Sequence, residues 1–282
     1  MGADQNLDAA GQARLVDVGG YRLALRQAGR GEPTVVLEMG LGAAGDFVDE
    51  IARQVAEFTR VVWYDRAGLG RSDPAPTPAP RTVADLAADL HRLLHVAQIP
   101  APYVLAGHSM GGLTARYYRQ HHSSDIAALV LIESTHEEQR ERLLAALPAD
   151  VGDELLAVAQ YRHALRVSWT DPKANAEQID NLANSRLMRQ CTRLDRLPLV
   201  VVSRGQAQAP AGLPPDLVAR RERAWRELQC ELAALSSRSV HLIAEHSGHL
   251  VNQDQPEMVV QGIRQALALV RVARDDTADA AR

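Results

Sequence analysis

The segment YVLAGHSMGG, residues 103–112, decides the fold of this chain. A short apolar run enters it, a Gly-x-Ser-x-Gly pattern centred on Ser109 occupies its middle, and residues 113–120 then alternate apolar and polar side chains. The order is strand, sharp turn, helix. Such a turn projects a serine hydroxyl into a cleft, and Gly107 and Gly111 let the strand and helix backbones approach each other. Three fixed positions also arise by chance, but this strand and helix context favours Ser109 as a nucleophile.

Length and charge limit the kind of protein this is. With 282 residues, the chain can form one α/β domain with an inserted subdomain or two domains. A net charge of -4 gives no electrostatic reason to expect nucleic acid or an acidic membrane as a partner. The two cysteines, Cys191 and Cys230, lie in no metal-ligand pattern, so we expect no metal and no other cofactor.

No hydrophobic segment suggests export or membrane insertion. The N-terminus has no apolar run of the signal-peptide kind, and no stretch approaches the roughly 18 apolar residues of a membrane span. We therefore expect a cytoplasmic protein, monomeric or homodimeric, that acts on a small molecule.

Strand and helix patterns alternate along most of the chain. Beside the run that enters Ser109, the predicted strands are residues 14–18, 21–27, 34–38, 61–64, 126–132, 199–203 and 239–244. Helices are predicted at residues 46–58, from residue 82 onward, at 216–235 and at 256–270. Thr82 with Asp85 three residues later is typical of a capping box. Two opening strands followed by strand–helix alternation indicate a mostly parallel sheet covered on both faces.

The strand pattern is interrupted from residue 135 to about residue 196. Three amphipathic helices are predicted there, at residues 137–147, 152–168 and 174–190. A helical insertion at one end of a sheet is typical of a lid. We predict a core of residues 14–134 and 197–274, a helical cap at 135–196, and flexible ends at 1–13 and 275–282.

A serine nucleophile needs a histidine base, and residue type alone does not select one among ten histidines. His246 and His249 both follow the last predicted strand. We favour His249, because Ser247-Gly248 before it makes a flexible loop and the final helix begins soon after. A loop histidine bonded only to backbone would leave Ser109 without a base.

The other histidines fit structural roles better. His108 adjoins Ser109, but successive residues across the turn point apart, so we interpret it as a packing or turn residue. His91 and His95 have the i, i+4 spacing of a metal pair, yet no Glu follows His91 as in metalloproteases, which favours a solvated helix face. His121 and His122 end a helix, where a cation suits the dipole.

The base in turn needs an acid that orients it. The loop after the predicted strand 199–203 contains no Asp or Glu, and Asp216, the first carboxylate beyond it, reads as a helix start. Glu133 ends the strand that follows the helix of Ser109, and a carboxylate there fixes the tautomer of the imidazole. We predict Glu133 as the acid, with Asp216, Asp195 or no acid as the alternatives.

The oxyanion that forms on attack needs two preorganised donors. We expect one to be the backbone amide of Met110, directly after the nucleophile, and the other the amide of Leu41 in the glycine-rich segment 39–42. Glycines on both sides of Leu41 let that backbone approach a substrate. The alternative is that this loop only turns the chain and binds no oxyanion.

The four motifs together resemble those of α/β-hydrolase fold proteins. They are residues 107–111, the segment DRAGLGRS at 65–72, the loop at Gly40 and Ser247-Gly248-His249. The resemblance covers residues 14–270. It implies an eight-stranded sheet with helices on both faces, a helical cap between strands six and seven, and a triad in the order Ser109, Glu133, His249.

The sequence departs from the family pattern in two places. Met39-Gly40 replaces the usual His-Gly of the oxyanion loop, which spares the amide of Leu41 but changes the wall of the pocket. The acid commonly found after strand seven is absent, whereas an acid after strand six resembles a variant found in some haloalkane dehalogenases. Their nucleophile is Asp, so the resemblance favours neither dehalogenation nor epoxide hydrolysis here.

The resemblance implies a cofactor-independent serine hydrolase that acts on a carboxylic ester or a lactone. Hydrolysis of a carbon–carbon bond or an amide on the same triad is the alternative reaction, and a ligand receptor on a hydrolase scaffold is the alternative class. Met39, Gly40, Tyr161 and Trp169 are expected to contact the substrate. Apolar residues at helical spacing in the cap, such as Val158, are expected to form its core.

Overall fold

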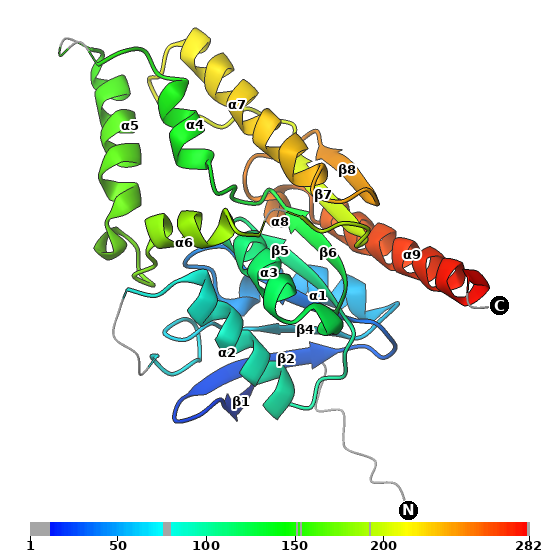
Figure 1. The fold of residues 1–282 in the computed structure, drawn as a ribbon. Coiled ribbons are helices and arrows are strands. Elements are labelled where there is room, and N and C mark those ends of the chain that lie inside the picture. Colours follow the sequence, from blue (N-terminus) through cyan, green and yellow to red (C-terminus); the bar gives the residue numbers. More distant parts are fainter. Residues whose placement is uncertain (1–11, 76–79, 151, 153, 192, 281–282) are drawn as a thin grey trace, which may run out of the picture.

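Eight strands form one sheet at the centre of the computed structural model, which describes residues 12–75, 80–150, 152, 154–191 and 193–280 (Figure 1). The strands are β1 (Arg14–Asp17), β2 (Arg22–Ala28), β3 (Thr34–Glu38), β4 (Val61–Tyr64), β5 (Tyr103–His108), β6 (Ile126–Ile132), β7 (Leu199–Arg204) and β8 (Ser239–Ala244). Their order in the sheet is β1-β2-β4-β3-β5-β6-β7-β8. The pairs β1–β2 and β2–β4 are antiparallel and all others parallel, as the sequence predicts.

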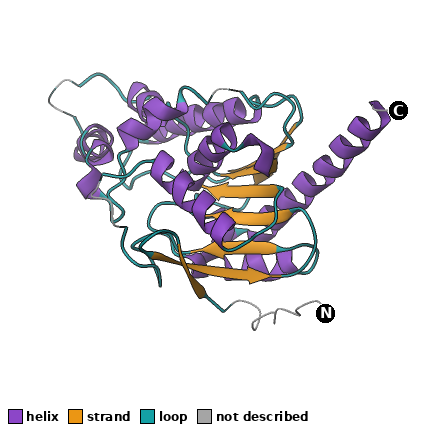
Figure 2. Cartoon of the chain, turned by 60° about the horizontal axis from the view of Figure 1, so that its bottom comes forward, coloured by secondary structure: helices purple, strands orange, loops and turns teal. Residues whose placement is uncertain are grey.

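Helices cover both faces of this sheet (Figure 2). The main ones are α1 (Asp49–Ala56), α2 (Val83–Val96), α3 (Met110–His121), α7 (Pro215–Ala233) and α9 (Pro256–Ala280). Neighbouring strand residues point to opposite faces, so Leu105 packs with α2 and α3 while Val104 packs with α1 and α9. Both faces are therefore buried, which explains the continuous apolar runs of the parallel strands.

The cap lies between β6 and β7, above the carboxyl ends of the strands (Figure 1). It contains α4 (Gln139–Ala145), α5 (Leu156–Arg166) and α6 (Asn181–Met188). Its core includes Leu143, Val158 and Leu165, packed against Leu213 and Leu217 near the start of α7. The beginning of α7 thus belongs to the packing of the cap, which the strand and helix pattern does not indicate.

The cap helices are shorter than predicted. Two short 3-10 turns, η3 (Ser168–Thr170) and η4 (Pro172–Ala174), follow α5, and residues 175–180 are not helical. The side chain of Asn175 bonds the backbone N–H of Ile179 at 2.9 Å and its C=O at 3.1 Å. Asp180 then accepts from the N–H of Ala183 at 2.9 Å as an N-cap. The predicted helix over 174–190 is wrong in its first half because these side chains compete for the backbone groups.

The two terminal segments, both predicted to be flexible, have different outcomes in the structure. The N-terminal segment predicted to be flexible lies outside the described residues, apart from residues 12 and 13. The last helix was expected to end at Val270, but α9 continues to Ala280, so most of the predicted C-terminal tail is helical. In the described part of the chain, no helix combines the length and the apolar character needed to cross a bilayer.

A short stretch of the cap is joined to the core by backbone hydrogen bonds. Arg81 donates its N–H to the C=O of Gln178 at 3.1 Å and accepts from the N–H of Asp180 at 2.8 Å. The side chain of Asn184 accepts from the N–H of Val83 at 2.8 Å, at the start of α2. This side of the cap is therefore fixed to the sheet domain.

Candidate active site

Ser109 occupies a strained turn between β5 and α3. Its φ and ψ are 53° and -121°, a conformation that non-glycine residues rarely adopt. A Cβ on Gly107 would lie 2.3 Å from the C=O oxygen of Gly111, and one on Gly111 would lie 2.4 Å from the C=O oxygen of Glu38. Both positions therefore require glycine, because no side chain fits between the strand and the helix.

His249 lies within hydrogen-bond distance of Ser109. Its Nε2 is 3.0 Å from the serine Oγ. The backbone around it is held from two sides, since its N–H donates to the side chain of Gln208 at 2.8 Å and its C=O accepts from Nε2 of His108 at 2.9 Å. His246, the alternative base, is exposed, and its N–H donates to Gln255 at 2.7 Å. The structure thus brings together the serine and the histidine that the sequence favours.

Glu133 lies at the end of β6, next to the same histidine. Its Oε1 is 3.7 Å from Nδ1 of His249, and its side chain is fully buried. Asp216, by contrast, is on the exposed face of α7, where it is 3.5 Å from Arg220. Asp195 forms a backbone bridge to Ser236 just before β8, at the opposite end of the sheet from Ser109. Glu133 is the candidate acid that the structure places beside His249.

Arg204 is a residue of this site that the sequence analysis missed. It ends β7, and its backbone N–H donates to Oε2 of Glu133 at 2.9 Å while its guanidinium donates to Oε1. The other arm of the guanidinium bonds both oxygens of Glu222 at 3.0 Å, and the group stacks 4.6 Å from the ring of Trp225. A cation thus ends β7, the strand after which the resemblance to α/β-hydrolase fold proteins leads us to expect a carboxylate.

The surroundings of Glu133 keep it ionised. Burial by itself raises the pKa of a carboxyl group, but His249 and Arg204 outweigh burial and hold the pKa of Glu133 below its ordinary value. A carboxylate that stays charged can stabilise the imidazolium formed when a base takes the proton of Ser109.

Two cavities meet at Ser109 and His249. One, of about 610 Å³, has a mainly apolar wall that includes Leu41, Phe47 and Leu250, with Asp46 at its side. The other, of about 390 Å³, lies under the cap, and its wall includes the polar residues Thr135, Gln139, Ser168, Asn175 and Asn181. Among the described residues, no lysine or arginine lines either cavity.

The two amides expected to hold the oxyanion belong to the same cavity as the serine. Leu41 and Met110 both line the cavity under the cap together with Ser109. Met110 is the first residue of α3, so its N–H has no acceptor within the helix and stays available. The structure therefore places both candidate donors in the cavity that holds Ser109.

The residues expected to contact the substrate divide into two groups. Gly40 and Trp169 line the cavities at Ser109. Met39 is only 3% exposed and packs in the core between the sheet and α1, so it does not form the pocket wall. Tyr161 packs in the core of the cap, where its hydroxyl accepts from Arg221 at 3.0 Å. Neither residue is among the described residues that line the two cavities, because Met39 is packed beneath its loop and Tyr161 faces the other helices of the cap.

His108 contributes a pH-dependent term to stability. Burial and the nearby His249 lower the pKa of His108 from 6.5 to about 4. The unfolded chain therefore takes up this proton first, so the contribution of His108 is complete above pH 6.5 and is lost as the pH falls toward 4. We expect protonation of His108 in the unfolded chain to lower the free energy of unfolding by up to about 3 kcal/mol between pH 6.5 and pH 4.

Urea unfolding at pH 7 and pH 4.5 checks this expectation. The variant His108→Gln keeps an N–H donor for the C=O of His249 but does not titrate, so its stability should fall less than that of the wild type between the two pH values. Other histidines with lowered pKa values, such as His136, are present in both proteins and cancel in the comparison. Equal losses in the two proteins would contradict the assignment.

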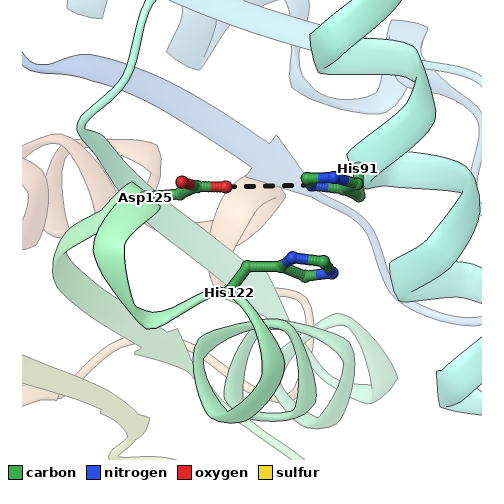
Figure 3. A group of neighbouring side chains, drawn as sticks. All are labelled: His91, His122 and Asp125. Atoms are coloured by element: carbon green, nitrogen blue, oxygen red, sulfur yellow. Dashed lines mark ion pairs between the residues drawn. The ribbon is translucent and has the colours of Figure 1, made fainter.

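A second group of histidines lies at the other end of the sheet. His91 on α2, His122 after α3 and Asp125 before β6 are neighbours, and His91 is 3.8 Å from Asp125 (Figure 3). The two imidazole rings stack with centroids 3.8 Å apart and planes inclined by 8°. Lone pairs that lie in parallel ring planes run side by side and do not converge on one point, as metal ligands must. We therefore interpret the group as a contact between α2 and the turn that leads into β6.

Known proteins resemble this chain over most of its length. A sequence model of the family described as alpha/beta hydrolase fold matches residues 33–271. An AB hydrolase superfamily protein of Gibberella zeae is 24% identical, over 85% of this chain and 88% of that protein. The protein RutD of Cronobacter turicensis, whose name proposes carbamate hydrolysis, is 26% identical over 80% of this chain and 88% of its own. A protein of Hormonema carpetanum, efuK, is 33% identical, but the match covers 46% of this chain and only 19% of that protein.

Solved structures share the architecture. A serine hydrolase involved in carbazole degradation, the CarC enzyme, is 22% identical with a TM-score of 0.62, over 92% of this chain and 100% of that chain. An esterase of Thermogutta terrifontis is 20% identical with a TM-score of 0.60, over 92% and 99%. At such identities the likeness concerns the fold alone.

Proposed function

This chain belongs to the alpha/beta hydrolase fold family, and from that premise we propose that it is a serine hydrolase that cleaves an uncharged carboxylic ester or lactone. The observation that carries the proposal is the 3.0 Å contact between Ser109 Oγ and His249 Nε2, with Glu133 buried on the other side of the imidazole. A nucleophile, a base and an orienting acid in this arrangement are what acyl transfer requires.

The reaction proposed for these residues has two halves. Ser109 attacks the carbonyl carbon as His249 takes its proton, and the amides of Leu41 and Met110 hold the oxyanion. Collapse of the tetrahedral intermediate expels the alcohol, which receives the proton from His249, and leaves an acyl-enzyme. Water activated by the same histidine then releases the acid and restores Ser109. Glu133 stays ionised throughout and stabilises the imidazolium.

The walls of the two cavities support the choice of an uncharged substrate. A buried carboxylate on a ligand needs a cationic partner, and no lysine or arginine is among the described residues that line the cavities. Asp46 at the side of the larger cavity would repel an anion. The polar wall under the cap instead suits a group that forms hydrogen bonds without charge.

Labelling and turnover together test the proposal. We expect a fluorophosphonate probe to label Ser109 and short p-nitrophenyl esters to be hydrolysed with a burst of p-nitrophenol. Labelling with negligible turnover of esters, lactones, carbamates and amides would favour a receptor on a hydrolase scaffold. Preferred turnover of an amide or of a carbon–carbon bond would favour the alternative reactions on the same triad.

The charge of the substrate gives a separate prediction. A neutral ester and an analogue of the same length that ends in a carboxylate should differ in kcat/KM by about tenfold or more in favour of the neutral ester, since desolvating an unpaired carboxylate costs at least about 1.4 kcal/mol. Steady-state kinetics with the matched pair measure the ratio. A preference for the anion would contradict the assignment of substrate class.

A further inference from the structure

Arg66 lies underneath the loop that carries one of the proposed oxyanion donors. It follows β4, its side chain is 3% exposed, and it pairs with the buried Glu38 at 3.0 Å. Its Nη1 donates to the C=O of Met39 at 2.7 Å and its Nη2 to the C=O of Gly40 at 2.6 Å. One guanidinium thus holds two successive carbonyl groups of the oxyanion loop.

Glu177 of the cap completes this arrangement from the opposite side. Its side chain is also 3% exposed, and its two oxygens bond Nε and Nη2 of Arg66 at 2.7 Å and 2.8 Å. One of these oxygens also accepts from the backbone N–H of Gly42 at 2.7 Å. Gly42 has a φ of 73°, and the N–H of Ala43 donates to the C=O of Gly40 at 3.2 Å, so residues 40–43 form a tight turn.

The contacts fix the peptide groups on both sides of Leu41. The C=O of Gly40 and the N–H of Leu41 belong to one trans peptide, so they point in opposite directions. Because Arg66 holds that C=O, the N–H of Leu41 is turned away from Arg66. The next peptide is fixed in the same way, because Glu177 holds the N–H of Gly42. A cation on the carbonyl oxygen also polarises the peptide and makes its N–H a stronger donor.

We propose that Glu177 is a positioning residue which, together with Arg66, orients the amide of Leu41 for oxyanion binding and so makes the oxyanion hole complete only when the cap is docked on the core. The inference rests on the proposed serine hydrolase function. Glu177 touches no reacting atom. It acts on the reaction through the backbone of the Met39–Gly42 loop.

Replacement of Glu177 tests the inference. Glu177→Ala should lower kcat by about 10- to 100-fold, less than the about 10²- to 10³-fold loss on removing an oxyanion donor outright. KM should change by less than about threefold, because the oxyanion exists only in the transition state and the intermediates. The rate of phosphonylation of Ser109 by a fluorophosphonate should fall in parallel. Hydrogen exchange in a peptide that spans residues 39–42 should become faster. Glu177→Gln, which keeps an acceptor for Gly42, should lose less than Glu177→Ala on every measure.

Glu154→Ala is the matched control. Glu154 pairs with Arg162 at 2.7 Å inside the cap, with side-chain exposures of 13% and 7%. Among the described residues, its side-chain hydrogen bonds go to Arg162 and none to the oxyanion loop. It should leave kcat within about twofold of the wild type while lowering the thermal midpoint, as the loss of a buried ion pair does.

The outcomes separate this inference from the function it rests on. A wild-type protein that hydrolyses no ester and is not labelled at Ser109 overturns the proposed function. An active wild type whose Glu177→Ala variant keeps its kcat, or loses activity only through KM, overturns the positioning role alone. Equal losses in Glu177→Ala and Glu154→Ala would also overturn it, because a general weakening of the cap would then explain both.

Discussion

Replacing Ser109 with alanine is expected to lower kcat by about 10⁶-fold, the scale seen when a catalytic serine is removed from a triad. The reason is chemical, because alanine cannot form the acyl-enzyme and His249 then has no hydroxyl to activate. The protein should still fold, since replacing the hydroxyl on Cβ with hydrogen removes only the hydrogen bond to His249 and adds no bulk. Ester hydrolysis under saturating substrate, with circular dichroism to monitor the fold, measures both expectations.

Ser124→Ala serves as the control for Ser109→Ala. Ser124 is exposed, at the far end of the sheet from His249, and its hydroxyl donates to the neighbouring Asp125 at 3.2 Å. This substitution should leave kcat unchanged. A Ser109→Ala protein with near-native turnover would remove Ser109 from the mechanism, together with the acyl-enzyme.

Replacing Glu133 with glutamine is expected to lower kcat by about 10⁴-fold, as loss of the acid does in other triads. The amide has nearly the shape of the carboxylate but carries no charge, so it stabilises neither the imidazolium nor the required tautomer. Arg204 keeps its pairing with Glu222 in this variant, at 3.0 Å to each oxygen, and so is not left as an unpaired buried charge. Steady-state kinetics of Glu133→Gln with a p-nitrophenyl ester measure the loss.

Asp216→Asn tests the alternative acid in the same assay. Its side chain is 64% exposed on α7, so the change should have little effect on kcat or on stability. If Asp216→Asn were impaired and Glu133→Gln were not, the acid would be assigned wrongly, and the loop after β7 would have to rearrange to bring α7 to His249.

The sheet and the turn at Ser109 could be predicted because the sequence patterns that indicate them are local. The strand and helix periods can be recognised within each segment. The glycines around Ser109 are required by a close approach of two backbones that lie within ten residues of each other in the sequence. Glu133 could be found as a candidate because parallel strands place their carboxyl ends at one edge, so the proposed acid lies at the end of the strand next to that of the proposed nucleophile. Even the cap was recognisable, by the absence of strand signals over some sixty residues.

The site residues that could not be predicted depend on contacts between segments that are distant in the sequence. Arg204 is one arginine among many in the sequence, and its pairing with Glu133 and Glu222 exists only once α7 packs beside β7. Glu177 was equally inconspicuous, because a carboxylate in a cap loop shows no pattern that points to Arg66. Tyr161 illustrates the opposite error, since an aromatic residue in a cap helix faces the core of the cap as readily as the substrate. Side-chain direction across a tertiary contact is the information that a single sequence lacks.

The strand order also determines when this site can exist during folding. Ile132 of β6 lies opposite Val202 of β7, although the whole cap separates them in the chain. Closing so long a loop costs more conformational entropy than closing a hairpin, and pairings of high sequence separation slow folding. Glu133 and Arg204 stand at the two ends of that loop, and His249 joins only after β8 has paired with β7. The proposed site is therefore complete only in the finished sheet, and no smaller folding unit of the chain contains all of its residues.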